Sequence, residues 1–300
     1  MDARMLVDCD IHIGYETLSD LLPYLDPPTR ELVIHSGSNG LVMPSYPWNH
    51  PTGWVRHDLY DRHETHDSNF TYLSLEVLRE RHLDAYDVTL GIVEPDEAAA
   101  FSILPNAQLA ARLCSAYNDW LLERWLQEEP RLRGMLVVPA QYPEAAAREI
   151  RRLGGRDEFV GVFLPGAARI PYGNQRFPGT RVAMVEGGLV PFVGFLWRLD
   201  ANWKACRSEI PWCRRRPSDY VWEHVRFATQ PLESPDDPAQ LLAAIEFLRP
   251  AETLMYASDF PHWDFDEPEQ TLRQLPAEWR DSIRARNAVD FFRLPLLAAV

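Results

Sequence analysis

The 300-residue sequence predicts an α/β fold, a TIM-barrel-like (β/α)₈ domain. Two observations support this prediction. Short apolar segments alternate with amphipathic ones, and polar residues stand at the ends of apolar segments that are far apart in the sequence. Alternation of strand and helix at this spacing is typical of a parallel sheet. The chain has no internal repeat and no low-complexity linker, so we expect residues 1–300 to form one domain.

Seven apolar segments have the length and composition of strands. They are residues 6–12, 88–93, 134–139, 160–164, 181–186, 225–229 and 254–258. The segments between them mostly have helical periodicity or a helix-starting proline. The expected helices are residues 73–83, 105–128, 143–153, 191–203, 238–248 and 267–294. A long irregular segment, residues 36–70, follows the first strand, where barrels build their active sites.

The fourth and fifth strand candidates are too close for a complete barrel. Arg181 comes only 17 positions after Leu164, and the segment between them contains no convincing helix. A (β/α)₈ barrel has eight strands and the sequence offers seven. We therefore expect a barrel that is incomplete or distorted around its fifth strand.

The composition excludes several classes of function. A net charge of −14 disfavours nucleic-acid or anionic-membrane partners, which need a basic surface. No apolar run approaches a membrane span, and the N-terminus lacks the pattern of a signal peptide, so we expect a cytoplasmic protein. Lys204 is the only lysine among 30 basic residues and falls on an expected helix, which argues against Schiff-base chemistry.

Two strand ends point to a metal site. Asp10 and His12 are two residues apart at the end of the first strand, so their side chains point to the same face. Asp259 ends the last strand, almost 250 residues later, and a barrel brings strand ends together. Carboxylates with an imidazole suit Zn²⁺, Mn²⁺ or Fe²⁺, and we expect zinc. The alternative is that these residues cap their strands.

At these residues the chain resembles the metal-dependent, amidohydrolase-related barrel enzymes that include the aminocarboxymuconate-semialdehyde and resorcylate decarboxylases. Asp10-Ile11-His12, the run from Ser258 to Asp264, and Glu186-Gly187-Gly188 with the segment that follows carry the resemblance over nearly the whole chain. It implies one divalent metal held by Asp10, His12 and Asp259, and a homodimer. It also implies a further histidine at the end of strand five, but no histidine lies between His82 and His224.

Further residues are candidates for catalysis. Asp259 would move a proton or position water beside the metal. His262 would donate to a substrate oxygen or pack against Trp263, and Glu186 would contact substrate or bond to the Gly187-Gly188 turn. Three other histidines (His57, His63 and His66) and two tryptophans (Trp48 and Trp54) in the first loop would supply an imidazole and an apolar wall, or be surface residues. Arg198 and Asp200 read as a structural pair on a helix.

The sequence leaves two functions open. The first is a metal-dependent hydrolase or non-oxidative decarboxylase that acts on a small carboxylated organic molecule. The second is a catalytically impaired or metal-free homologue, which would be a lyase or cyclase with His12 and Asp259 as acid and base, or would bind a small molecule or partner. The absent fifth-strand histidine motivates the second.

Overall fold

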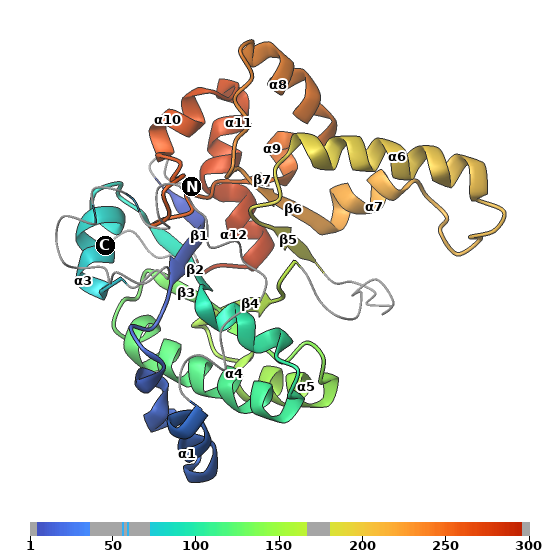
Figure 1. Cartoon of the computed structure of the whole chain (residues 1–300). Coiled ribbons are helices and arrows are strands. Elements are labelled where there is room, and N and C mark those ends of the chain that lie inside the picture. Colours follow the sequence, from blue (N-terminus) through green and yellow to red (C-terminus); the bar gives the residue numbers. More distant parts are fainter. Residues whose placement is uncertain (1–4, 37–55, 57–58, 60–72, 167–180, 296–300) are drawn as a thin grey trace. The chain divides into compact units, whose positions relative to one another are not determined.

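The structure is a computed structural model that describes residues 5–36, 56, 59, 73–166 and 181–295 (Figure 1). The chain forms two compact units. The N-terminal unit comprises residues 11–176 with 260–263, and the C-terminal unit comprises residues 1–10, 177–259 and 264–300. The division passes between Asp10 and Ile11 and again between Asp259 and Phe260, so both units are built from separate pieces of sequence. That residues 1–300 act as one domain stays a prediction.

The N-terminal unit contains a parallel sheet of β2 (Leu90–Pro95), β3 (Leu132–Val137) and β4 (Phe159–Phe163), together with the end of β1 (Val7–Ile13) from Ile11 on. The strand order is β1-β2-β3-β4. The strands β2, β3 and β4 pair in parallel, with Gly91 opposite Leu132. Gly91 is required here because a Cβ at this position would lie 2.5 Å from Cδ1 of Ile11.

Helices connect these strands, and the sequence predicts those within residues 73–83, 105–128 and 143–153 but not the three at Leu18–Tyr24, Pro27–Ser36 and Glu97–Ile103. They are a 3₁₀ helix at Leu18–Tyr24, α1 (Pro27–Ser36), α3 (Leu75–Leu78) continued by a π-helical turn at Arg79–Leu83, a 3₁₀ helix at Glu97–Ile103, α4 (Ala107–Leu121) continued by a π-helical turn at Leu122–Leu126, and α5 (Pro143–Leu153). In Figure 1, α4 and α5 run side by side. Asn106 caps α4 by accepting from the N–H of Leu109. The buried Asn118 on α4 donates to the carbonyl of Val137 and accepts from its N–H, which fixes the helix on β3.

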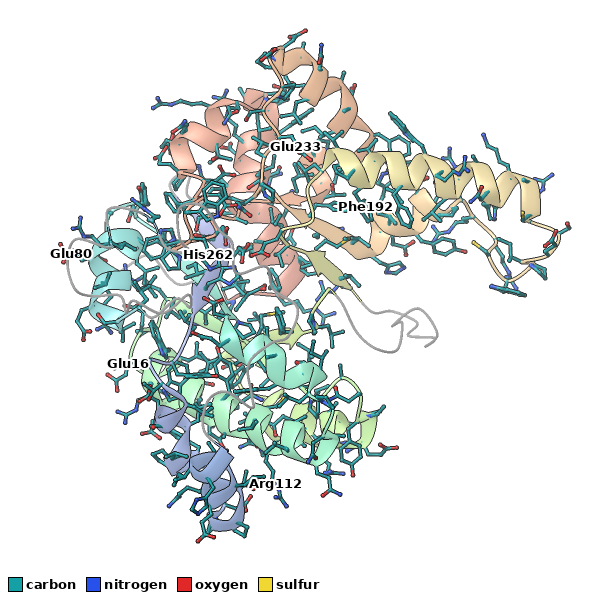
Figure 2. All side chains as sticks on the ribbon, in the orientation of Figure 1. Glu16, Glu80, Arg112, Phe192, Glu233 and His262 are labelled. Carbon is teal, nitrogen blue, oxygen red and sulfur yellow. The ribbon has the colours of Figure 1, made fainter. Side chains whose placement is uncertain are left out.

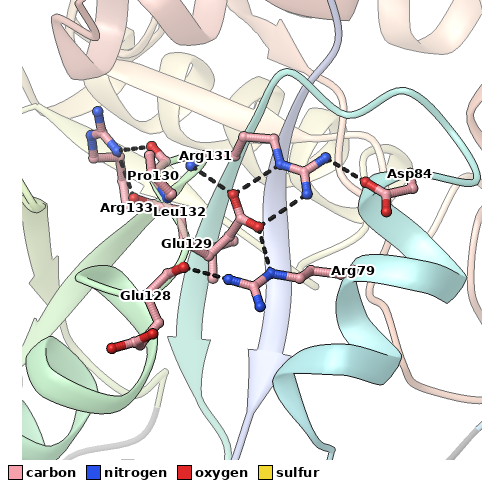
Figure 3. Close-up of polar contacts among 8 residues, drawn as sticks. All are labelled: Arg79, Asp84, Glu128, Glu129, Pro130, Arg131, Leu132 and Arg133. Atoms are coloured by element: carbon pink, nitrogen blue, oxygen red, sulfur yellow. Dashed lines mark hydrogen bonds and ion pairs between the residues drawn. The ribbon is translucent and has the colours of Figure 1, made fainter.

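A network of ion pairs stabilises the turn that leads into β3 (Figure 3). The Glu129 carboxylate accepts from Nε of Arg79 at 2.8 Å and from Nε of Arg131 at 2.9 Å. Arg131 also pairs with Asp84 at 2.8 Å. Burial raises the pKa of Glu129, but the hydrogen bonds from Arg131 and Arg79 outweigh it and lower the pKa to about 2. Glu129 therefore stays ionised and ties the turn after α3 to the start of β3.

The C-terminal unit contains a second parallel sheet. Its order is β5-β6-β7, formed by Val182–Met184, Val225–Ala228 and Leu254–Met255. The helices are α6 (Val190–Cys206), α7 (Pro217–His224), α8 (Pro238–Ile245) with a 3₁₀ turn at Glu246–Leu248, α9 (Pro250–Thr253), α10 (Pro268–Arg273), α11 (Ala277–Asp281), a π-helical turn at Ser282–Arg286, and α12 (Asn287–Phe292). In Figure 1, α6 and α7 lie against each other.

One expected pairing is wrong. Asp200 on α6 does not pair with Arg198 in the described structure. Its carboxylate accepts from the N–H and the hydroxyl of Ser218, at 3.0 and 2.7 Å. Ser218 lies in the first turn of α7, where backbone N–H groups lack partners within the helix. Asp200 therefore caps the neighbouring helix.

The predicted α/β architecture is confirmed. Each of the seven strand candidates overlaps one observed strand, and each expected helix is present, with Lys204 on α6. Most of the 36–70 loop and residues 167–180 lie outside the described residues. The incomplete fifth position therefore stays a prediction. Across the described ranges, no helix has the length and apolar character needed to cross a membrane.

Candidate metal centre

The C-terminal unit brings Asp10 and Asp259 together. The N–H of Asp259 donates to the carbonyl of Asp10 at 3.1 Å. Just before these residues in both segments, the N–H of Cys9 donates to the carbonyl of Tyr256, also at 3.1 Å. The Asp10 and Asp259 side chains are buried, with 0% and 3% exposure. Two acidic residues that the sequence separates by almost 250 positions are therefore joined through their backbones, as the strand ends predict.

Asp8 holds this junction, and sequence reasoning missed it. Its Oδ1 accepts from the N–H of Ser258 at 3.0 Å and from the N–H of Asp10 at 3.2 Å. Asp8 is fully buried and precedes Asp10 and His12 on the same face of β1. The Asp-x-Asp-x-His pattern was the available signal. One carboxylate thus bonds to the backbone beside both candidate ligands of this unit.

Asp259 is held in an unusual conformation. Its φ is 62°, in the left-handed region that few residues other than glycine adopt and that Asp tolerates better than most. Its Oδ2 accepts from Nε2 of Gln230 at 3.0 Å, and the same Nε2 donates to Oδ2 of Asp264 at 3.1 Å. Nearby, burial raises the pKa of Asp266 to about 6, and the charges of Asp264 and Asp259 add to that rise. The carboxylate of Asp259 is therefore fixed both by its backbone and by an amide donor.

The N-terminal unit pairs His12 with His262. The N–H of His12 donates to the carbonyl of Phe260 at 2.8 Å, and Ile11 forms a parallel bridge with Phe260. The two imidazole rings lie 4.2 Å apart between centroids, tilted by 33°. Both are buried, with 7% and 6% exposure, and Figure 2 labels His262. His262 thus packs on His12, and its predicted neighbour Trp263 is 49% exposed.

Acidic groups surround His262, and the sequence did not reveal them. Oδ2 of Asp96, the residue that follows β2, lies 3.6 Å from Nε2 of His262. Burial and then the charge of Asp96 raise the pKa of Glu97 well above its usual range. Burial also raises the pKa of Tyr117, with further contributions from Glu97 and Asp96. The His262 imidazole is therefore buried beside the carboxylate of Asp96.

Glu186 lies two residues past β5 and is exposed, with a φ of 53°. In the same unit, Glu233 (Figure 2) accepts from the N–H groups of Leu189 and Val190, both at 2.9 Å, and so caps α6. The histidines and tryptophans predicted to act from the first loop, His57, His63, His66, Trp48 and Trp54, lie outside the described residues.

Each unit contains residue types that suit a divalent cation. The N-terminal unit contains the imidazoles of His12 and His262, and the C-terminal unit contains the carboxylates of Asp259 and Glu186. Asp10 adds a buried carboxylate two residues before His12 on β1. Buried carboxylates and imidazoles are the ligand types of Zn²⁺, Mn²⁺ and Fe²⁺ sites. Burying such charged groups is costly unless they are paired or bind a metal.

A family model described as an amidohydrolase matches residues 7–169 and 174–294. The chain belongs to this amidohydrolase family. The two matched segments include both strand ends discussed above. The break between them falls in the stretch where the sequence lacks the expected fifth strand.

One relative of this amidohydrolase is a decarboxylase. The chain is 28% identical over 144 residues to a gamma-resorcylate decarboxylase of Rhodococcus jostii, a match that covers 45% of this chain and 40% of that one. The aligned part therefore spans less than half of that relative.

Solved structures show the same fold. A 5-carboxyvanillate decarboxylase from Sphingomonas paucimobilis superposes with a TM-score of 0.68 at 17% identity, covering 97% of this chain and 99% of that one. A 5-carboxyvanillate decarboxylase from Novosphingobium aromaticivorans, with bound manganese and a nitrobenzoic acid, superposes with a TM-score of 0.65 at 17% identity, covering 97% of both chains. This likeness identifies the fold as the TIM-barrel type of these enzymes.

Proposed function

We propose that this amidohydrolase is a metal-dependent, non-oxidative decarboxylase of a small carboxylated aromatic compound. The observation that supports the proposal is the backbone hydrogen bond between Asp259 and Asp10 at two strand ends of a chain in this family. The similar proteins described above are decarboxylases of resorcylate and carboxyvanillate, which supports decarboxylation over hydrolysis.

Asp10, His12 and Asp259 would hold the cation. A bound divalent metal would orient the substrate carboxylate and stabilise negative charge on its oxygens. Manganese in a structural relative favours Mn²⁺, and Zn²⁺ remains the alternative predicted from the ligand types. Glu186 would contact the substrate from the end of β5.

His262 would supply the proton. Loss of CO₂ breaks the bond between the ring carbon and the carboxyl carbon, and its electron pair stays on the ring carbon. That carbon must then accept one proton. The Asp96 carboxylate, 3.6 Å from Nε2, would orient the His262 imidazole, and Asp259 would return a proton to it from water.

Metal analysis tests this proposal. Protein purified without chelator should contain a stoichiometric divalent metal and release CO₂ from 2,6-dihydroxybenzoate or 5-carboxyvanillate. The variants His12→Ala and Asp259→Asn should lose the metal, whereas the exposed controls His35→Ala and Asp281→Asn should keep it. Metal-free protein that gains no activity with added Mn²⁺ or Zn²⁺ would refute the proposal.

The absent fifth-strand histidine favours a second candidate, a catalytically impaired homologue that binds the same class of small molecule. It would bind the carboxylated aromatic compound but release no CO₂ when loaded with metal. We further propose a cytoplasmic homodimer, which equilibrium sedimentation would distinguish from a monomer.

A further inference from the structure

We infer that Gln230 is a positioning residue that sets the orientation of the Asp259 carboxylate toward its metal. The inference rests on the proposed function, because it takes Asp259 as a ligand. Gln230 follows β6 by two residues and is 1% exposed. Its Nε2 donates to Oδ2 of Asp259 and to Oδ2 of Asp264, so both N–H bonds of the amide are used.

The partners fix which end of the amide faces Asp259. Ionised carboxylates only accept hydrogen bonds, so two of them around one atom require the nitrogen of the amide. Oδ2 of Asp259 is therefore engaged by a donor that cannot rotate away without losing Asp264 as well. Outer partners of this kind orient a ligand and raise its affinity for metal.

The neutrality of Gln230 matters at this position. The chain has 30 basic residues, almost all arginine, yet the side chain against Asp259 is an uncharged amide. A guanidinium there would bond to the same carboxylate but repel a divalent cation bound to it. A glutamate would add a third acceptor and leave Asp259 without its donor. Glutamine supplies the hydrogen bonds without a charge that competes with the metal.

The backbone beside Gln230 is fixed independently. The N–H of Thr229 donates to the carbonyl of Met255 at 2.9 Å, and Oγ1 of Thr229 accepts from the N–H of Ala257 at 3.1 Å. These bonds join the end of β6 to the segment that leads into Asp259. Replacing the Gln230 side chain therefore removes the bond to Asp259 while the strand stays anchored.

The test compares metal binding by Gln230→Leu with that by the wild type and by Gln240→Leu, an exposed control on α8. Mn²⁺ is titrated into metal-stripped protein, and the visible absorption spectrum of Co²⁺-loaded protein reports the ligand arrangement. We expect Gln230→Leu to bind Mn²⁺ about 10–100-fold more weakly and to change the Co²⁺ spectrum. Gln240→Leu should match the wild type in both.

A second variant covers the case in which Gln230→Leu does not fold. Asp264→Ala keeps the bond from Gln230 to Asp259 but removes the other acceptor, so it should weaken Mn²⁺ binding less and shift the Co²⁺ spectrum in the same direction. Wild-type affinity and spectrum in the folded variants, with binding abolished in Asp259→Asn, would overturn the inference alone. Wild-type binding by Asp259→Asn would overturn the proposed function and the inference with it.

Discussion

Replacing Glu129 with glutamine should lower stability at neutral pH far more than in acid. The pKa of Glu129 is lowered from about 4.5 to about 2, so its ionised form stabilises the fold above pH 4.5. That stabilisation is lost as the pH falls toward 2. The pKa difference of about 2.5, at about 1.36 kcal/mol per pKa unit, gives an upper value of about 3.4 kcal/mol for the contribution of the ionised carboxylate to the unfolding free energy. Because the side chains of Arg79 and Arg131 are 34% and 29% exposed, solvent screening reduces it to about 1–2 kcal/mol.

Urea unfolding of Glu129→Gln and wild type at pH 7 and pH 3, followed by tryptophan fluorescence, measures this effect. The difference in unfolding free energy should shrink by more than half at pH 3. The neighbouring Glu128→Gln is the matched control, because only its backbone carbonyl takes part in the network. A difference of the same size at both pH values would show that the ionised carboxylate is not what stabilises this turn.

Three further predictions concern Asp8, Asp266 and Gly91. Asp8→Ala should cost about 2–4 kcal/mol in urea unfolding, because two buried N–H groups lose a charged acceptor, whereas Asp8→Asn keeps an acceptor and should cost less. Asp266→Asn should stabilise metal-stripped protein by about 1–2 kcal/mol at pH 8 but not at pH 4. The reason is that the pKa of Asp266 is raised to about 6, so ionisation of this carboxyl above pH 6 opposes folding. Equal effects on the unfolding free energy at both pH values would contradict this. Gly91→Ala should destabilise by about 1–3 kcal/mol, because its Cβ would overlap Ile11, and a wild-type urea midpoint would exclude that overlap.

Much of the fold could be predicted because it depends on local patterns. Apolar runs ending in Gly, Pro or acidic residues marked all seven observed strands, and Pro143 marked the first turn of α5. The backbone contact of Asp10 with Asp259 could be predicted because a barrel fold brings the ends of its first and last strands together. Their roles as ligands remain predictions, as do those of His12, His262 and Glu186.

The residues that hold these candidates in place were not predictable. Asp8 bonds to a segment 250 residues away, and the Asp-x-Asp-x-His pattern places it beside the candidate ligands without showing this partner. Gln230 carries no charge and precedes a proline, so the sequence predicts only a turn there. The sequence around Asp96 predicts only an acidic loop residue after β2. In each case the partner is distant in sequence, and only the folded chain shows it.

The contact between Asp8 and Ser258 has a consequence for synthesis. At about 5–20 residues per second, a ribosome makes β1 roughly 10–50 s before the strand that completes it. Closing a loop of 250 residues rather than 25 costs about 2 kcal/mol more in chain entropy. Nascent chains that stop before Asp259 should therefore lack the metal site altogether. The β1 strand, with its buried apolar residues, must also remain without its contacts to the last strand until translation is nearly finished.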